Sequence, residues 1–259
     1  MADPLFGLGS EKYALAIHTA SPELGLAIRN RAGSERSQTW NLGRDLSTQL
    51  HVHLNEFLHP QQWSDLAFIA VAKGPGGFTG TRIGVVTART LAQQLNIPLF
   101  SISTLKAFAW ATLQQQSTPS PSLPGQKSRQ LQGENTDIAI EMAARRGDVY
   151  CAVYTVSKKS SRDSDSGVPP LINQQLVDQR LTDQPILSEL ATEASDTVMS
   201  QEQWHERLSS WPKPYQIFVA ENGLGWTVPS LLDLAVQRWS AGDRPCWSHA
   251  LPYYGQSPV

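Results

Sequence analysis

The chain has 259 residues, of which 40% are hydrophobic and 17% are charged. This balance is typical of a globular protein, and the length suits one large domain or two lobes, so extensive disorder is excluded. The net charge of −2 and the pI near 6.3 argue against autonomous nucleic-acid binding, because such proteins normally present a strongly basic surface. The two cysteines, Cys151 and Cys246, lie far apart and suggest neither a disulfide framework nor a zinc site. The N-terminal segment lacks the pattern of a signal peptide and no stretch is long and apolar enough to span a membrane, so we expect a cytoplasmic protein without membrane contact.

The first apolar runs of the chain predict a meander followed by a helix. Turn-rich segments separate three short apolar runs, which we expect to pair as antiparallel strands over residues 13–17, 24–29 and 35–42. Leucines and Phe57 then recur at helical spacing over residues 46–58, with Asp45 as the expected cap and Pro60 just beyond the end.

Strands and helices alternate in the next segment. A continuous apolar run at 66–72 predicts a strand covered on both faces, and it leads through a glycine-rich loop into a second helix. A strand at 99–102 and a helix at 104–113 follow. A meander leading into strand-helix crossovers predicts an α/β fold with a mixed sheet, in the order typical of ribonuclease H-like proteins.

The second half of the sequence is less regular. Residues 114–135 are rich in Gln, Ser and Pro and predict a flexible insertion. Apolar runs at 138–142 and 149–156 predict a hairpin across the RRGD turn, and a second polar break spans 157–170. No element is predicted over 171–210, whereas a strand is predicted at 215–220 and a helix at 230–239.

These patterns predict two lobes. We assign residues 1–113 to an N-terminal lobe, 114–135 to the insertion and 136–259 to a less regular C-terminal lobe. The C-terminal tail carries no pattern of its own and is free to return to the first lobe.

The glycine-rich loop after the fourth predicted strand has two interpretations. Its structural residues are Gly74, Pro75, Gly76, Gly77, Phe78 and Gly80. Backbone N–H groups at a helix start attract phosphate, but Thr81 and Arg82 stand where a phosphate-binding P-loop needs Lys and Ser or Thr. The dinucleotide pattern fails as well, because Thr79 occupies the place of its third glycine. A tight structural turn is therefore favoured, with Thr79 or Thr81 as the cap of the following helix.

The helix after this loop carries a row of small residues. Gly84, Ala88 and Ala92 follow one another at intervals of four, beside a broader stripe of larger side chains. Such a row allows close packing against a neighbouring helix, in the same chain or in another. Packing alone slightly favours the same chain.

Four segments in this order resemble the bacterial TsaB (YeaZ) family: ALAIHTA, VAKGPGGFTGTRIGVVTARTLA, ISTLKAFA and RRGDVYCAVY. The resemblance implies the two-lobed fold of actin, sugar kinases and Hsp70, each lobe a mixed sheet flanked by helices. It also implies a non-catalytic partner of the paralogue TsaD, which works with the ATPase TsaE to transfer a threonylcarbamoyl group to the adenosine beside the anticodon of tRNA. TsaD and TsaE would then be the subunits that bind ATP and ADP, and this chain would contact tRNA only within the complex. In the absence of TsaD, the chain could form a homodimer.

In the family, helices corresponding to residues 46–58 and 82–95 form a bundle with TsaD, so the resemblance outweighs the intrachain interpretation of the small-residue row. It implies that a partner contacts Leu50, Leu54, Thr79, Arg82, Gly84, Val85, Ala88, Arg89, Leu91 and Ala92.

Two departures from the family bear on catalysis. His18 stands where most relatives have an Asp, and a neutral imidazole is a poor ligand for Mg²⁺. Ala143 replaces a second carboxylate of the family. A metal site is not indicated either, because His51 and His53 lie two positions apart and on a helix point in different directions, so they cannot share a metal. We therefore predict no catalytic residue and no metal site. An autonomous phosphotransferase or ATPase is the alternative, and a glycoprotease-like metallopeptidase is a distant third.

Overall fold

The computed structural model is described over residues 11–30, 32–117, 136–156, 190–221 and 223–255. Its first sheet has five strands in the order β3-β2-β1-β4-β5. Strands β1 (Tyr13–His18), β2 (Glu23–Asn30) and β3 (Glu35–Asn41) form an antiparallel meander. Strands β4 (Leu66–Ala72) and β5 (Leu99–Ile102) add in parallel. β1 and β4 are buried on both faces, which explains why their sequences are continuously apolar.

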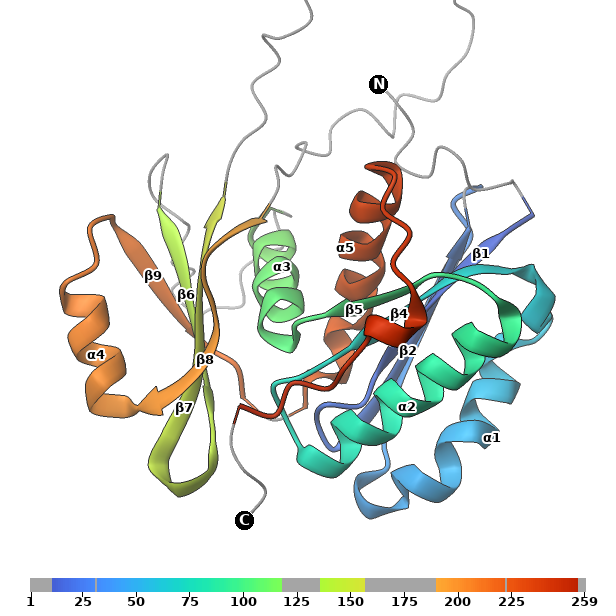
Figure 1. Cartoon of the computed structure of the whole chain (residues 1–259), viewed down its shortest axis with the longest axis horizontal. Coiled ribbons are helices and arrows are strands. Elements are labelled where there is room, and N and C mark those ends of the chain that lie inside the picture. The colour runs from blue at the N-terminus through green and yellow to red at the C-terminus, as the bar shows by residue number, and fades with distance from the viewer. Residues whose placement is uncertain (1–10, 31, 118–135, 157–189, 222, 256–259) are drawn as a thin grey trace, which may run out of the picture.

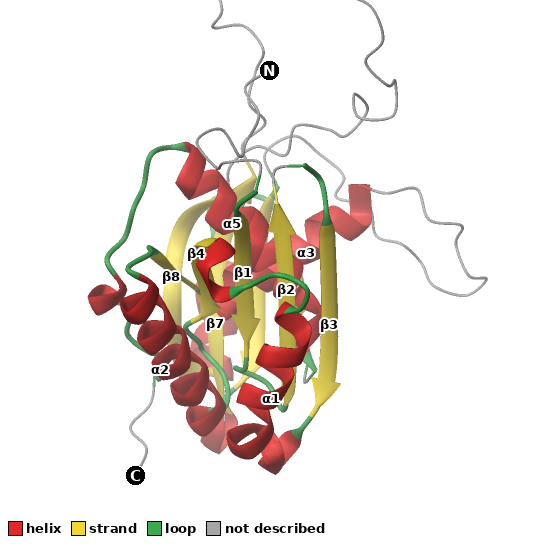
Figure 2. Ribbon diagram, turned by 90° about the vertical axis from the view of Figure 1, so that its right-hand side faces the viewer, coloured by secondary structure: helices red, strands yellow, loops and turns green. Residues whose placement is uncertain are grey.

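Helices cover both faces of this sheet. α1 (Leu46–Leu58) and α2 (Phe78–Leu95) lie side by side on one face (Figure 2), where their apolar residues pack with Leu15, Ile17 and Val71. On the other face lies α5 (Val228–Ser240), with α3 (Thr104–Ser117) beside it and between the two sheets (Figure 1). None of the described helices is long and apolar enough to cross a membrane.

The second sheet has four strands in the order β8-β7-β6-β9. They are β6 (Asp137–Ala143), β7 (Asp148–Val156), β8 (Leu190–Ser200) and β9 (Tyr215–Val219). Ile138 and Ile140 point toward the core shared with α3, whereas Ala139 faces the opposite side. There α4 (Gln201–Ser209) covers the sheet through Trp204, which is fully buried and whose indole N–H donates to Glu141.

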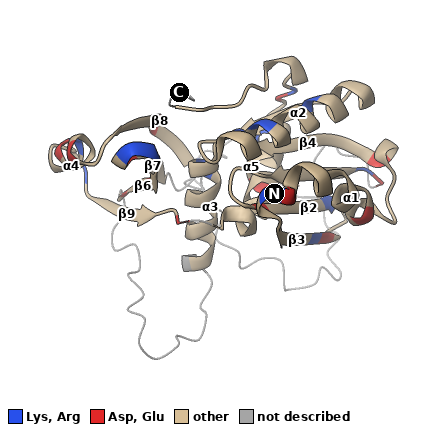
Figure 3. Cartoon of the chain, turned by 90° about the horizontal axis from the view of Figure 1, so that it is seen from below, with Lys and Arg blue, Asp and Glu red and all other residues tan. Residues whose placement is uncertain are grey.

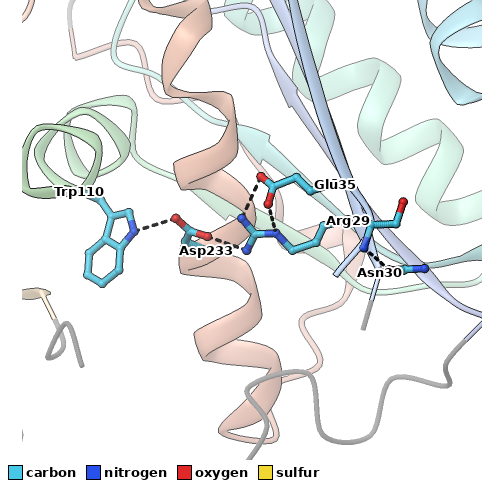
Figure 4. A network of polar contacts seen from close by, with 6 residues as sticks. Arg29, Asn30, Glu35, Trp110 and Asp233 are labelled. Atoms are coloured by element: carbon cyan, nitrogen blue, oxygen red, sulfur yellow. Dashed lines mark hydrogen bonds and ion pairs between the residues drawn. The ribbon is translucent and has the colours of Figure 1, made fainter. Parts of the chain in front are cut away.

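A polar network fixes α5 and α3 to the first sheet (Figure 4). The Arg29 guanidinium on β2 donates to Asp233 Oδ1 at 2.6 Å and to Glu35 on β3 at 2.9 Å. Asp233, on α5, also accepts the indole N–H of Trp110 on α3 at 3.0 Å. Both carboxylate oxygens are therefore used, so three elements distant in sequence are held by one side chain.

The predicted elements of the first lobe are present, with bounds that differ by a few residues. The helix predicted to end at residue 113 continues to Ser117, because glutamine is a good helix former and the extra turn needs no apolar face. Residues 114–117 therefore do not belong to the insertion, and 118–135 lie outside the described residues. Asp45 does not act as a side-chain cap for α1, since a short 3₁₀ turn at Gly43–Asp45 leads directly into the helix.

The second half of the chain contains two elements that were not predicted. β8 and α4 occupy part of the segment for which no element was predicted, and the predicted break at 157–170 lies outside the described residues. The prediction for residues 136–259 left the tail free to return to the first lobe. From Leu224 onward the chain returns to the first sheet, where α5 packs on β1 and β2, and the tail then runs alongside α2.

Candidate functional site

The glycine loop is packed against the segment that follows β1. Gly74 has a φ of +97°, and a Cβ atom there would lie 2.5 Å from the carbonyl oxygen of Tyr253. Gly77 N–H donates to the carbonyl of Ala20 at 2.8 Å, and Thr19 Oγ1 donates to the carbonyl of Gly80, also at 2.8 Å. The loop therefore turns sharply while remaining in contact with its neighbours, as expected for a structural turn.

The start of α2 differs from the prediction. The helix begins at Phe78 with Gly77 as its N-cap residue, and no side chain caps it. Thr79 and Thr81 lie inside the first turn, so neither is the cap, and Thr81 is buried. The helix starts earlier than expected because Gly77, with φ −58° and ψ 120°, already has the non-helical backbone of an N-cap residue.

Most residues of the predicted partner surface are directed into the protein itself. Val85, Ala88 and Ala92 are fully buried in the core between α2 and the first sheet, and Leu50 and Leu54 of α1 share this core.

Gly84 is buried for the same reason. A Cβ atom at this position would lie 2.0 Å from Thr19 Oγ1, so the row of small residues lets α2 approach the end of β1. The prediction that Leu50, Leu54, Gly84, Val85, Ala88 and Ala92 contact a partner is therefore corrected, since these residues are buried.

The outward face of the two helices carries a different set of residues. Arg82 and Thr79 are exposed, while Arg89 and Leu91 are half-buried, so these four predicted contacts remain accessible. Val86 is 52% exposed and Val52 of α1 is 38% exposed, so each helix places one large apolar side chain on the surface. Arg82 and Arg89 are the only charged residues of α2 (Figure 3), so the exposed side of α2 is apolar and basic, whereas α1 exposes the acidic side chain of Glu56.

A cavity of about 1040 Å³ opens between the two lobes. The glycine loop, the β6–β7 turn and Tyr254 line it, and Ala143 contributes a methyl group. Arg44 and Arg145 come from opposite sides of the cavity. Within the described residues no group of three or more His, Cys, Asp or Glu side chains is arranged to hold a metal ion.

His18 ends β1 in a fully buried position. Neither ring nitrogen has a hydrogen-bond partner among the described residues, and burial lowers the pKa of the imidazole to about 4. The ring is therefore neutral at pH 7. The other two histidines considered are separate: His51 is exposed, whereas His53 stacks on Trp40 with ring centroids 4.7 Å apart.

Several residues of this region escaped the sequence analysis. Tyr253 and Tyr254 come from a tail without any pattern, and Asp196 comes from a strand that was not predicted. No local signal marks them, because their role depends on contacts between segments more than fifty residues apart.

Comparisons with known proteins agree with this geometry. The model of a TsaD family, described as tRNA N6-adenosine threonylcarbamoyltransferase, matches residues 44–164. The TsaB protein of Bacillus subtilis is 34% identical over 54% of this chain and 54% of its own length, and that of Escherichia coli is 30% identical over the same shares. Both are named tRNA threonylcarbamoyladenosine biosynthesis proteins, and the chain spans about half the length of these curated relatives.

Solved structures extend the similarity of the fold to the whole chain. YeaZ from Pseudomonas aeruginosa aligns with a TM-score of 0.61 at 19% identity, covering 94% of this chain and all of the other. A protein described as similar to peptidase YeaZ from Pseudomonas aeruginosa aligns with a TM-score of 0.65 and covers 95% of this chain. The predicted two-lobed α/β fold, with mixed sheets flanked by helices, is thus confirmed.

Proposed function

We propose that this chain is a member of the TsaB (YeaZ) family and the non-catalytic subunit that docks a TsaD-type protein for threonylcarbamoyl transfer to tRNA. The observation that carries the proposal is the outward face of α1 and α2, where Val52 and Val86 are exposed beside Arg82 and Arg89. Exposed apolar side chains beside two arginines on α2 are suited to a protein partner whose facing surface is apolar and acidic.

A TsaE-type ATPase joins the complex, and nucleotide belongs to that protein and to the TsaD-type subunit. With a net charge of −2, this chain contacts tRNA only within the assembly. A homodimer through the same face forms when the TsaD-type protein is missing, and the assembly resides in the cytoplasm.

The absence of catalysis is proposed from the chemistry of two positions. His18 is buried and neutral, and Mg²⁺ prefers oxygen ligands, so this residue does not replace the carboxylate of its relatives. Ala143 lines the cavity and has no group that binds a metal or moves a proton. Calorimetry of the isolated chain with ATP and Mg²⁺ tests this, and tight metal-dependent binding would favour an autonomous ATPase instead.

A matched pair of substitutions tests the docking face. Val86→Asp places a charge in the centre of the proposed contact, and we expect the Kd for the TsaD-type protein of the same organism to rise at least tenfold. Val219→Asp changes a side chain of similar exposure, 54% against 52%, on the edge strand of the second sheet and should leave the Kd within about twofold. Equal affinities of the two variants in calorimetry would place the contact elsewhere.

A further inference from the structure

The C-terminal segment lies between the two lobes and is bonded to both. Tyr253 N–H donates to the carbonyl of Lys73 at 2.7 Å, directly after strand β4 of the first sheet. The hydroxyl of the same tyrosine donates to the backbone carbonyl of Asp196 at 2.9 Å, in strand β8 of the second sheet. One residue thus links the two sheets.

The next residue repeats this arrangement. The hydroxyl of Tyr150, on β7, donates to the carbonyl of Tyr254 at 3.0 Å. The Tyr254 ring packs against Phe78 at the start of α2, with centroids 4.5 Å apart. Tyr150, Phe78 and Tyr254 all line the interlobe cavity, so the segment forms part of its wall.

A second polar contact joins the lobes at the same residue of β8. Ser103, which precedes α3, donates from Oγ to Asp196 Oδ1 at 2.8 Å, and the Tyr154 hydroxyl reaches the same oxygen at 3.2 Å. Asp196 therefore accepts a hydrogen bond from Tyr253 through its backbone carbonyl and one from Ser103 through its side chain. Two hydrogen bonds that meet at one residue are expected to break together when the lobes separate.

We propose that residues 252–255 form a strap that controls how far the two lobes open, with the hydroxyl of Tyr253 as its releasable bond. This inference does not depend on the docking function. The strap forms part of the cavity wall, so its release widens the entrance of the cavity. It also breaks the contact between the Tyr254 ring and Phe78 in the first turn of α2.

The strap can be tested by hydrogen exchange of the full-length chain at neutral pH. Tyr253→Phe removes only the hydroxyl that bonds Asp196, and we expect the Tyr253 amide to exchange about fivefold faster, as a typical net hydrogen bond predicts. Tyr254→Phe is the matched control, because among the described residues the Tyr254 hydroxyl has no hydrogen-bond partner. It should leave the rate within about twofold. No change in Tyr253→Phe, or an equal change in both variants, overturns the proposal.

A third variant distinguishes opening of the lobes from peeling of the tail alone. Ser103→Ala removes the hydrogen bond to Asp196, which joins the lobes without involving the tail. Because Ser103 Oγ also accepts the Lys106 N–H, the substitution can loosen the start of α3, and exchange of the α3 amides serves as the control for that effect. If the lobes open as units, Ser103→Ala also speeds exchange of the Tyr253 amide. If that amide is unaffected, or if the buried amides of β1 accelerate as much, the strap does not control lobe opening.

Discussion

The buried imidazole of His18 makes the stability of this protein sensitive to mildly acidic pH. Because burial lowers its pKa from 6.5 to about 4, the folded protein binds fewer protons at this site than the unfolded chain. The contribution of His18 is fully present above pH 6.5 and is lost as the pH falls toward 4. Linkage over this window predicts a loss of about 2 kcal/mol in the free energy of unfolding between pH 8 and pH 5.

Urea denaturation at a series of pH values measures this effect. His18→Leu keeps the site filled and removes both unpartnered nitrogens, so we expect a smaller pH dependence and higher stability at pH 5. His51→Ala is the control, since His51 is exposed and its loss should leave the slope unchanged.

Variants must be compared with the unmodified protein because Asp196 changes the free energy of unfolding with pH in the opposite direction to His18. Burial raises the pKa of its carboxyl, so its contribution is present at low pH and is lost as the pH rises through the raised pKa. This carboxyl is unchanged in the His18 and His51 variants. If His18→Leu and the unmodified protein lose equal stability between pH 8 and pH 5, the reasoning about His18 is wrong.

Two further substitutions test the packing of the first lobe by urea denaturation. Gly84→Ala forces a methyl group toward Thr19 Oγ1, which is itself bonded to Gly80, and should cost about 1–3 kcal/mol; an effect below 0.5 kcal/mol would contradict the close approach of α2. Asp233→Ala leaves the indole N–H of the buried Trp110 and one arm of Arg29 without their acceptor and should cost about 2–3 kcal/mol. Asp243→Ala removes an exposed partner of Arg238 and should cost less than 1 kcal/mol, so similar losses in the two aspartate variants would argue against the network.

The first lobe was predictable because its elements carry local signals. The strand at Leu66–Ala72 is continuously apolar since it is buried on both faces, and α1 repeats its leucines at the helical period because one face packs on the sheet. Both signals can be detected within a window of about fifteen residues.

The second lobe lacked such signals for physical reasons. β8 is an edge strand with many half-exposed positions, so its sequence LATEASDTVMS alternates only weakly. The helix α4 buries only Trp204 and Leu208, which is too short an apolar stripe to predict a helix. The return of α5 to the first sheet depends on long-range contacts such as Arg29 with Asp233, which no local pattern reveals.

The row of small residues in α2 shows how a correct pattern led to a wrong contact. Gly84, Ala88 and Ala92 indicate that something approaches this face closely, and the structure shows that the first sheet and Thr19 do so. The docking face that we propose therefore lies on the opposite side of the helix, with Val86 near its centre. A charge at Ala88 would therefore unfold the protein before it informed on binding, whereas a charge at Val86 changes the surface and leaves the core intact. Binding assays interpreted without this distinction would assign the partner surface to residues that only support it.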